Sequence, residues 1–113
     1  MAQVIPLRRG DAKTLRVIVR TVTMEYLDLN PFIEAKLTLY TDPFDATTNV
    51  DDWSTTVPTE AFFRDRTNGE VEFYLTVAQT TALDQRQYTL RIRLIKDASH
   101  EYTIYEGVLE MRA

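Results

Sequence analysis

EVEFYLTVAQTTALDQRQYTLRIRLI, residues 70–95, is the stretch of the sequence that decides the fold. Apolar and polar residues alternate over Glu70–Val77, and they alternate again over Tyr88–Ile95. A period of two is typical of strands that have one buried and one exposed face. Residues 78–84, AQTTALD, lack this period, and we expect one or two helical turns there. The stretch therefore predicts two strands whose short connection carries the chain from one sheet to another.

The alternation also assigns the side chains of these two strands to faces. We expect the inward side chains to be Val71, Phe73, Leu75, Val77, Tyr88, Leu90, Ile92 and Leu94. The outward positions include Glu70 and Glu72 on the first strand, and Arg91 and Arg93 on the second. Opposite charges on neighbouring strands stabilise a sheet, so we expect these glutamates to face the two arginines. Such a face suits either a solvated surface or an interface between subunits.

Three further segments have the same alternation, and we predict that they are strands: Lys13–Thr23, Ile33–Tyr40 and Tyr102–Arg112. In the second of these, we expect Ile33, Ala35, Leu37 and Leu39 to point inward and Glu34, Lys36, Thr38 and Tyr40 to point outward. In the third, Gly107 predicts a bulge, because a glycine inside a strand often marks one.

Shorter strands are predicted at Gln3–Leu7, Trp53–Val57 and Glu60–Asp65, and the polar residues 41–52 are predicted to be a loop. Pro6 places the first strand at a sheet edge, because proline cannot donate to a ladder. Seven or eight short strands without a long helix predict an all-β fold. We expect an immunoglobulin-like antiparallel β-sandwich with one short helical turn, formed as a single domain over the whole chain.

Two turns are predicted from glycines that can take a positive φ: Gly10-Asp11 and Asn68-Gly69. We expect the Asp11 side chain to accept a hydrogen bond from the backbone two residues further on. Arg9, Gly10 and Asp11 form the tripeptide that animal cell-surface receptors bind, but a bend between two strands explains it more simply.

A tyrosine corner is predicted where the helical turn leads into the strand that starts at Tyr88. In such a corner, a phenol hydroxyl bonds back to the backbone a few residues upstream and holds the crossover between the sheets. Leu83 and Tyr88 would fill the two apolar positions of this corner.

Composition limits the classes of function. The chain has 113 residues, a net charge of −4, a pI near 4.9 and no cysteine. The missing cysteines exclude disulfides, thiolate nucleophiles and cysteine zinc sites. An acidic surface is a poor partner for nucleic acid, and no apolar run predicts a signal peptide or a membrane span.

No catalytic pattern appears, and we expect neither an enzyme nor a cofactor. His100 with Asp97 and Ser99 could nominally form a triad, but neighbouring residues of one turn rarely reach that geometry. Four aspartates in the polar loop could attract calcium, although their spacing differs from that of an EF-hand. They are Asp42, Asp45, Asp51 and Asp52.

Aromatic residues near the polar loop have two interpretations. Phe44 and Trp53, with Phe62 and Phe63, could form a platform for host glycans, or they could be core lids and interface anchors. We consider Phe44, Trp53, Arg91 and Arg93 candidate contacts with a protein partner or a glycan.

Four segments together resemble a known family. They are VIPLRRGDAKTLRVIV (4–19), IEAKLTLY (33–40), NGEVEFYLTVAQTTALDQRQYTLRIRLI (68–95) and YTIYEGVLEMR (102–112). They are similar to the immunoglobulin-like module at the N-terminus of phage baseplate upper proteins. Ala12 and Arg86 depart from the threonine and glycine that are usual there.

The resemblance implies structural work in a virion without catalysis. The partners would be other virion proteins and copies of this chain, in particles assembled in the host cytoplasm. A tail or baseplate component is the first hypothesis. A head decoration protein of the capsid is the second, and a carbohydrate-binding module for host-surface glycans is an alternative of another class.

Overall fold

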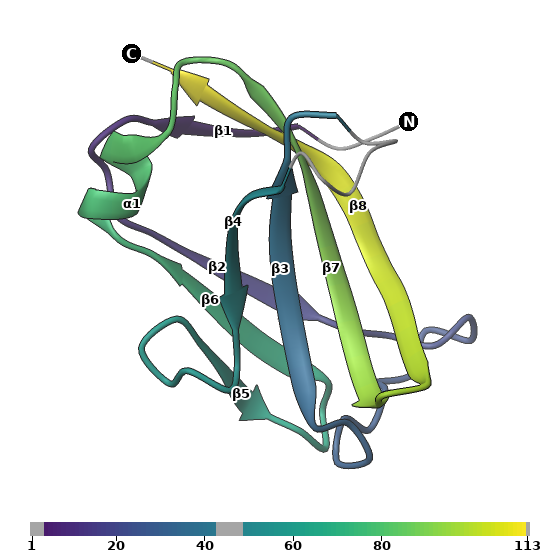
Figure 1. Ribbon diagram of the computed structural model, residues 1–113. Coiled ribbons are helices and arrows are strands. Elements are labelled where there is room, and N and C mark those ends of the chain that lie inside the picture. Colours follow the sequence, from purple (N-terminus) through teal and green to yellow (C-terminus); the bar gives the residue numbers. More distant parts are fainter. Residues whose placement is uncertain (1–3, 43–48, 113) are drawn as a thin grey trace.

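The computed structural model describes residues 4–42 and 49–112, and these residues form two β-sheets packed face to face (Figure 1). One short helix, α1, lies at the end of the sandwich where β1 turns into β2. The elements are β1 (Val4–Arg8), β2 (Lys13–Ile18), β3 (Glu34–Tyr40), β4 (Asn49–Ser54), β5 (Ala61–Asp65), β6 (Glu70–Leu75), α1 (Val77–Ala82), β7 (Gln87–Asp97) and β8 (His100–Arg112). No helix in the described ranges is both long and apolar enough to cross a membrane.

The strand order is that of an immunoglobulin-like sandwich, which confirms the predicted fold. One sheet has the order β1-β8-β7-β3-β4, and the other has the order β2-β6-β5. In immunoglobulin domains, strands B, E and D share one sheet and strands C, F and G share the other. Here β2, β6 and β5 take the positions of B, E and D, and β3, β7 and β8 take the positions of C, F and G.

The first strand departs from the antiparallel arrangement. β1 pairs in parallel with β8, from Val4 opposite Val108 to Arg8 opposite Arg112. In the immunoglobulin arrangement the first strand can border the second, on the sheet that contains B, E and D. Here β1 belongs to the opposite sheet, and β2 is left at a sheet edge.

The core lies between the two sheets and is built from the alternating residues that the sequence predicts. β6 contributes Val71, Phe73 and Leu75, β7 contributes Tyr88, Leu90, Ile92 and Leu94, and β3 contributes Ala35, Leu37 and Leu39, all of them buried. Burying each large apolar side chain contributes about 1.5–3 kcal/mol to folding. The two strands of the 70–95 stretch therefore supply a large part of the core.

α1 begins earlier than expected, so the prediction that Val77 points into the core is wrong. Thr76 caps the helix: its hydroxyl accepts a hydrogen bond from the Gln79 N–H at 3.2 Å, and Gln79 Oε1 accepts one from the Thr76 N–H at 2.9 Å. This capping box ends β6 at Leu75 and leaves Val77 exposed on the first turn of the helix. The spacing of Thr76 and Gln79 is a sequence signal for such a box.

The bounds of two other predicted strands are wrong. β2 ends at Ile18 rather than Thr23, because the backbone of Val19 bonds instead to Gly69 and Leu27. β4 covers residues 49–54, which include part of the predicted polar loop. It stops at Ser54, where a turn begins with the Val57 N–H donating to the Ser54 carbonyl at 3.0 Å.

The predicted bulge at Gly107 is also wrong. Gly107 lies opposite Leu90 in regular register. The register shifts earlier in β8, where Ile92 faces Tyr105 and Arg93 faces Thr103, so that Ile104 is the extra residue.

The outward face of β3 is more covered than its alternation predicts. Thr38 and Tyr40 are buried, because Arg93 donates a hydrogen bond from Nη2 to Thr38 Oγ1 at 3.1 Å and the Arg91 guanidinium lies 5.1 Å from the centre of the Tyr40 ring. The long arginine stems thus cover polar and aromatic neighbours. Ile33, predicted to point inward, precedes β3 and is exposed.

Candidate interaction surfaces

The turn that contains Arg9, Gly10 and Asp11 is fastened to α1. Gly10 has a φ of 87°, which favours glycine, and its N–H donates to Thr80 Oγ1 at 3.2 Å. The Thr80 hydroxyl donates to the Asp11 carbonyl at 3.0 Å. Arg9 Nη2 donates to the Thr81 carbonyl at 2.8 Å. The tripeptide is therefore a tight connection held by α1, through the Asp11 backbone rather than through the predicted side-chain contact.

The second predicted turn joins β5 to β6 and depends on Gly69. Gly69 has a φ of 72°, and a Cβ atom added there would lie 2.5 Å from the Val19 carbonyl oxygen and 3.0 Å from that of Leu27. Asn68 has no positive φ; it bonds through its N–H and its side-chain amide to the Asp65 carboxylate, at 3.2 and 2.7 Å. Gly69 thus lets the backbone of the 19–27 segment approach closely.

The geometry at Tyr88 is that of a tyrosine corner. Its hydroxyl accepts a hydrogen bond from the Asp84 N–H at 2.9 Å and lies 3.3 Å from the Asp84 carbonyl. Leu83, which ends α1, is buried with Tyr88 in the core. The Arg86 guanidinium lies over the Tyr88 ring, 5.6 Å from its centre. These contacts hold the crossover from β6 to β7.

Trp53 cannot act as a sugar platform. Its side chain is fully buried, and the indole Nε1 donates to Gln79 Oε1 at 3.0 Å. Phe63 is buried beneath Arg66, whereas Phe62 is half exposed. Phe44 lies outside the described residues. The described aromatic residues of the predicted platform therefore do not converge on one surface, because Trp53 and Phe63 complete the core.

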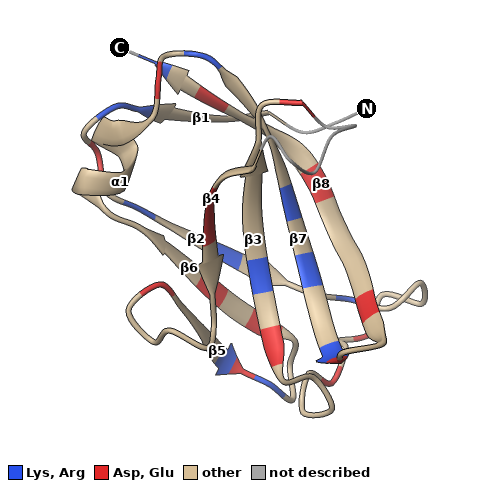
Figure 2. Cartoon of the chain, in the orientation of Figure 1, with Lys and Arg blue, Asp and Glu red and all other residues tan. Residues whose placement is uncertain are grey.

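The predicted pairing of Glu70 and Glu72 with Arg91 and Arg93 is wrong, because α1 places β6 and β7 in different sheets. Arg91 instead pairs with Glu106 at 3.2 Å, and Arg93 pairs with Glu101 at 2.5 Å. Figure 2 shows the basic positions of β7 beside the acidic positions of β8. The outer face of the five-stranded sheet thus carries two cross-strand ion pairs.

The outer face of the three-stranded sheet has a carboxylate at its centre. Glu72 accepts hydrogen bonds from Arg16 Nε and Nη2 at 3.1 and 3.0 Å and from the Tyr74 hydroxyl at 3.1 Å, and Arg64 lies 3.6 Å away. Burial raises the pKa of Glu72, but these hydrogen bonds and positive charges outweigh it and hold the pKa below its ordinary value of 4.5. The ion cluster fixes Arg16, which belongs to the edge strand β2.

The candidate catalytic and calcium-binding residues serve local structure. The Asp97 carboxylate accepts from the Ser99 N–H at 2.8 Å and contacts His100 Nδ1 at 2.8 Å, and these bonds hold its pKa below the ordinary range. Within the described ranges, no three carboxylate or imidazole groups gather closely enough to hold a metal ion. Asp51 accepts from the Asp52 N–H at 2.8 Å, and burial raises its pKa. Asp45 lies outside the described residues.

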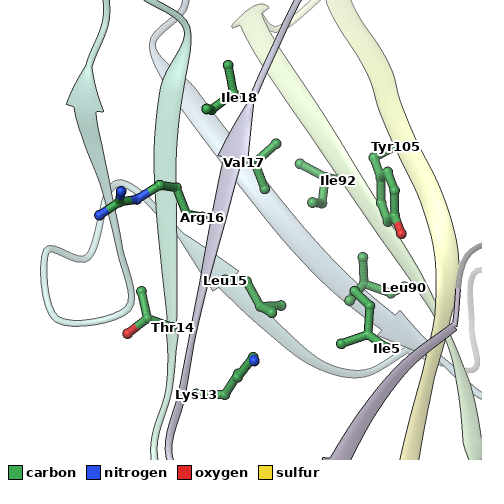
Figure 3. A pocket seen from close by; sticks show the side chains of 10 residues that line it. All are labelled: Ile5, Lys13, Thr14, Leu15, Arg16, Val17, Ile18, Leu90, Ile92 and Tyr105. Carbon is green, nitrogen blue, oxygen red and sulfur yellow. The ribbon is translucent and has the colours of Figure 1, made fainter.

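A groove opens between the sheets beside β2. Its larger part has a volume of about 430 Å³, and a smaller part of about 320 Å³ continues it past Val17, Ile18 and Tyr105, which line both parts. Figure 3 shows Leu15 and Val17 pointing toward Ile92 on the opposite sheet, and Arg16 pointing away. The alternation of the sequence places Leu15 and Val17 on one face of their strand and Arg16 on the other. It carried no signal for the groove, which depends on the sheet that β1 joins.

Comparison with known proteins shows the fold. No protein-family model matches the chain, and no curated protein sequence matches it. Among solved structures, the chain is similar to the N-terminal domain of phage TP901-1 ORF48, with a TM-score of 0.59 and 9% sequence identity. The similarity covers 98% of this chain and 86% of that one. The two chains therefore share the arrangement of the sandwich over nearly its full length.

Proposed function

We propose that this chain is a structural component of a phage virion, in the tail or baseplate, that acts through contacts with other proteins and without catalysis. The observation that carries the proposal is the structural similarity to a domain of a phage protein over 98% of the chain. The family resemblance of the sequence supports the same class of protein, because it rests on the order of turns and alternating segments rather than on the three-dimensional structure.

The chemistry of the surfaces is consistent with a protein that works by contact. The charged side chains of both outer faces are engaged in ion pairs, such as Arg91 with Glu106 and Arg16 with Glu72. A rigid face of paired charges suits recognition of a complementary protein surface. The nominal triad of Asp97, Ser99 and His100 has a structural explanation, since the Asp97 carboxylate closes the β7–β8 turn.

The test is the location of the chain in phage particles. Particles of the phage that encodes it are purified, dissociated into heads and tails, and analysed by quantitative mass spectrometry with known head and tail proteins as internal references. We expect the chain in the tail fraction at a fixed stoichiometry. Enrichment in heads would instead support the decoration protein of the capsid, and absence from particles would overturn the proposal.

A separate assay addresses the alternative of glycan binding. The folded chain is applied to an array of bacterial surface glycans, beside a Phe62→Ser variant that removes an exposed aromatic side chain. The proposal expects no binding by either protein. Binding that Phe62→Ser abolishes would favour the carbohydrate-binding module.

A further inference from the structure

The backbone of β2 has one side without a partner strand among the described residues. β2 lies at the edge of the three-stranded sheet, where only β6 pairs with it. The Val19 N–H donates to Gly69 at 2.9 Å, on the side of β6. Because backbone groups alternate in direction along a strand, those of Thr14, Arg16 and Ile18 point to the free side. A row of unpaired N–H and C=O groups is a template for an additional strand.

The groove beside this free edge holds nearly all the incompletely covered apolar side chains that pack on the core. Seven apolar residues pack against the core while only partly buried, and all but Phe32 line the groove. They are Ile5, Leu15, Val17, Leu27, Ile104 and Tyr105. An added strand would direct alternate side chains between Leu15 and Val17 on one side and the opposite sheet on the other. The groove therefore favours an occupant with an apolar residue at every second position.

The charged residues along the groove are all basic. Lys13 and Arg16 line its larger part, Arg20 lines its smaller part, and no lining residue of either part is acidic. This is unusual for a chain with a net charge of −4. Arg16 lies on the outer face, beside the position that an outward residue of an added strand would occupy. Glu72 accepts hydrogen bonds from its Nε and Nη2, and 54% of the Arg16 side chain remains exposed to an acidic neighbour. Charge complementarity therefore favours acidic residues at the alternate positions of the occupant.

The same charges disfavour a second copy of this strand as the occupant. If β2 paired antiparallel with β2 of another molecule, the free backbone groups of Thr14, Arg16 and Ile18 would have to meet each other. The register centred on Arg16 places the two arginines directly opposite. The neighbouring registers still place Lys13 and Arg16 of both copies close together in one short two-stranded ribbon. Like charges at such positions destabilise a pair of strands.

We propose that the free edge of β2 binds an extended segment of another protein, with alternating apolar and acidic residues, as an added β-strand. The apolar side chains enter the groove, the acidic side chains lie beside Arg16, and Lys13 and Arg20 attract the segment toward the edge. This is recognition by strand addition, in which backbone bonds supply affinity and the groove supplies specificity. The inference rests on the proposed function and names the chemistry of one protein contact.

The experiment uses the full chain labelled with ¹⁵N and a capped seven-residue peptide that alternates valine and glutamate. We expect saturable shifts of the amide signals of Thr14, Arg16 and Ile18, and slower hydrogen exchange at these three amides. A matched peptide with lysine in place of glutamate should bind roughly tenfold more weakly or not at all. Equal binding of the two peptides, or no shift at these amides with the acidic peptide, would overturn the proposal.

Two matched variants separate strand addition from surface attraction. Thr14→Pro removes a donor on the free side and no bond to β6, so the sandwich should remain folded and the binding of the acidic peptide should be lost. Lys13→Glu should weaken binding roughly threefold to tenfold. Lys96→Glu makes the same charge change at an exposed position outside the groove, and it should have little effect. Full binding by a folded Thr14→Pro protein would overturn strand addition.

Two further measurements separate other outcomes. Shifts of the same three amides with protein concentration, without peptide, would assign the edge to a second copy and overturn the proposal. Failure of the proposed function appears elsewhere, as absence of the chain from phage particles. A chain that is present in tails but does not bind the acidic peptide would retain the proposed function and lose this inference.

Discussion

The two sides of the sandwich differ, because one is closed and the other is open. At the β4–β5 edge, the chain passes directly from one sheet to the other through residues 55–60. Hydrogen bonds join this turn to both sheets. The Ala35 N–H of β3 donates to Thr55 Oγ1 at 2.9 Å, and the Tyr74 N–H of β6 donates to the Glu60 carbonyl at 2.8 Å. Trp53, two residues before the turn, is fully buried, and its indole donates to Gln79 on α1. This edge is sealed by a short covalent connection and one large side chain.

At the other side, no strand closes the edge of β2. β1 extends the five-stranded sheet by pairing with residues 108–112 of β8, and it leaves the groove beside Leu15 and Val17. The contrast shows that a short crossover between the sheets forces the core to close around it. Where a strand joins the far sheet instead, apolar surface stays accessible and can serve another chain.

The sealed edge should be the more sensitive to truncation. We expect Trp53→Ala to lower the free energy of unfolding by about 3–5 kcal/mol, because it opens a large cavity in the core. Urea denaturation followed by far-UV circular dichroism measures the loss. Trp53→Phe is the control: it keeps most of the ring volume and loses the bond to Gln79, so it should cost roughly 1–2 kcal/mol. Equal stability of Trp53→Ala and the wild type would contradict this account of the edge.

Where β2 ends, the open side depends on Gly69, which lets the backbones of Val19 and Leu27 approach closely. We expect Gly69→Ala to cost about 2–3 kcal/mol, because alanine combines a strained positive φ with a Cβ atom 2.5 Å from the Val19 carbonyl oxygen. Gly10→Ala shares the positive φ, but its Cβ atom would find only an ordinary contact at 3.8 Å. It should cost about 1 kcal/mol. Comparing the thermal unfolding of the two variants tests the difference, and equal losses would show that φ alone matters.

The most direct comparison uses two valines that face each other across β2 and β6. Val17 is half-buried at the groove, and its pairing partner Val71 is fully buried. We expect Val71→Ala to cost about 2–3 kcal/mol and Val17→Ala about 1 kcal/mol, because the Val17 methyl groups already contact solvent. Chemical denaturation of both variants measures the ratio. A Val17→Ala loss as large as that of Val71→Ala would mean that the groove is closed in solution.

Much of the core was predictable from the sequence, because it depends on patterns within single strands. β6 and β7 each lie between two other strands, so their inner faces must be apolar and their alternation is clear. The end of β6 was missed, because the alternation was followed to Val77, although the spacing of Thr76 and Gln79 is a sequence signal for the capping box that ends the strand. These features depend on residues that are close in sequence.

The surfaces were less predictable, because they depend on contacts between distant residues. The burial of Trp53 requires Gln79 on α1 to accept its N–H. The burial of Glu72, which alternation placed outward, requires cations from both neighbouring strands, Arg16 and Arg64. Nothing near Gly10 indicates whether β1 joins β2 or β8, and that choice creates the groove.

The smallest expected effect concerns the ion cluster that holds Arg16 beside the open edge. The pKa of Glu72 is lower in the folded chain than its ordinary value of 4.5. The ionised carboxylate therefore contributes stability above pH 4.5, and this contribution is lost as the pH falls through the folded pKa. We expect Glu72→Gln to be less stable than the wild type at neutral pH, and the difference should shrink below pH 4.5. Denaturant titrations at a series of pH values measure it.

Tyr74→Phe separates the hydrogen bonds in this cluster from the charges. The variant removes one donor to Glu72 and keeps both arginines, so the pKa of Glu72 should rise toward its ordinary value without reaching it. A ¹³C NMR titration of the Glu72 carboxyl carbon reports this directly in both proteins. A wild-type midpoint at or above 4.5 would mean that burial outweighs Arg16, Arg64 and Tyr74.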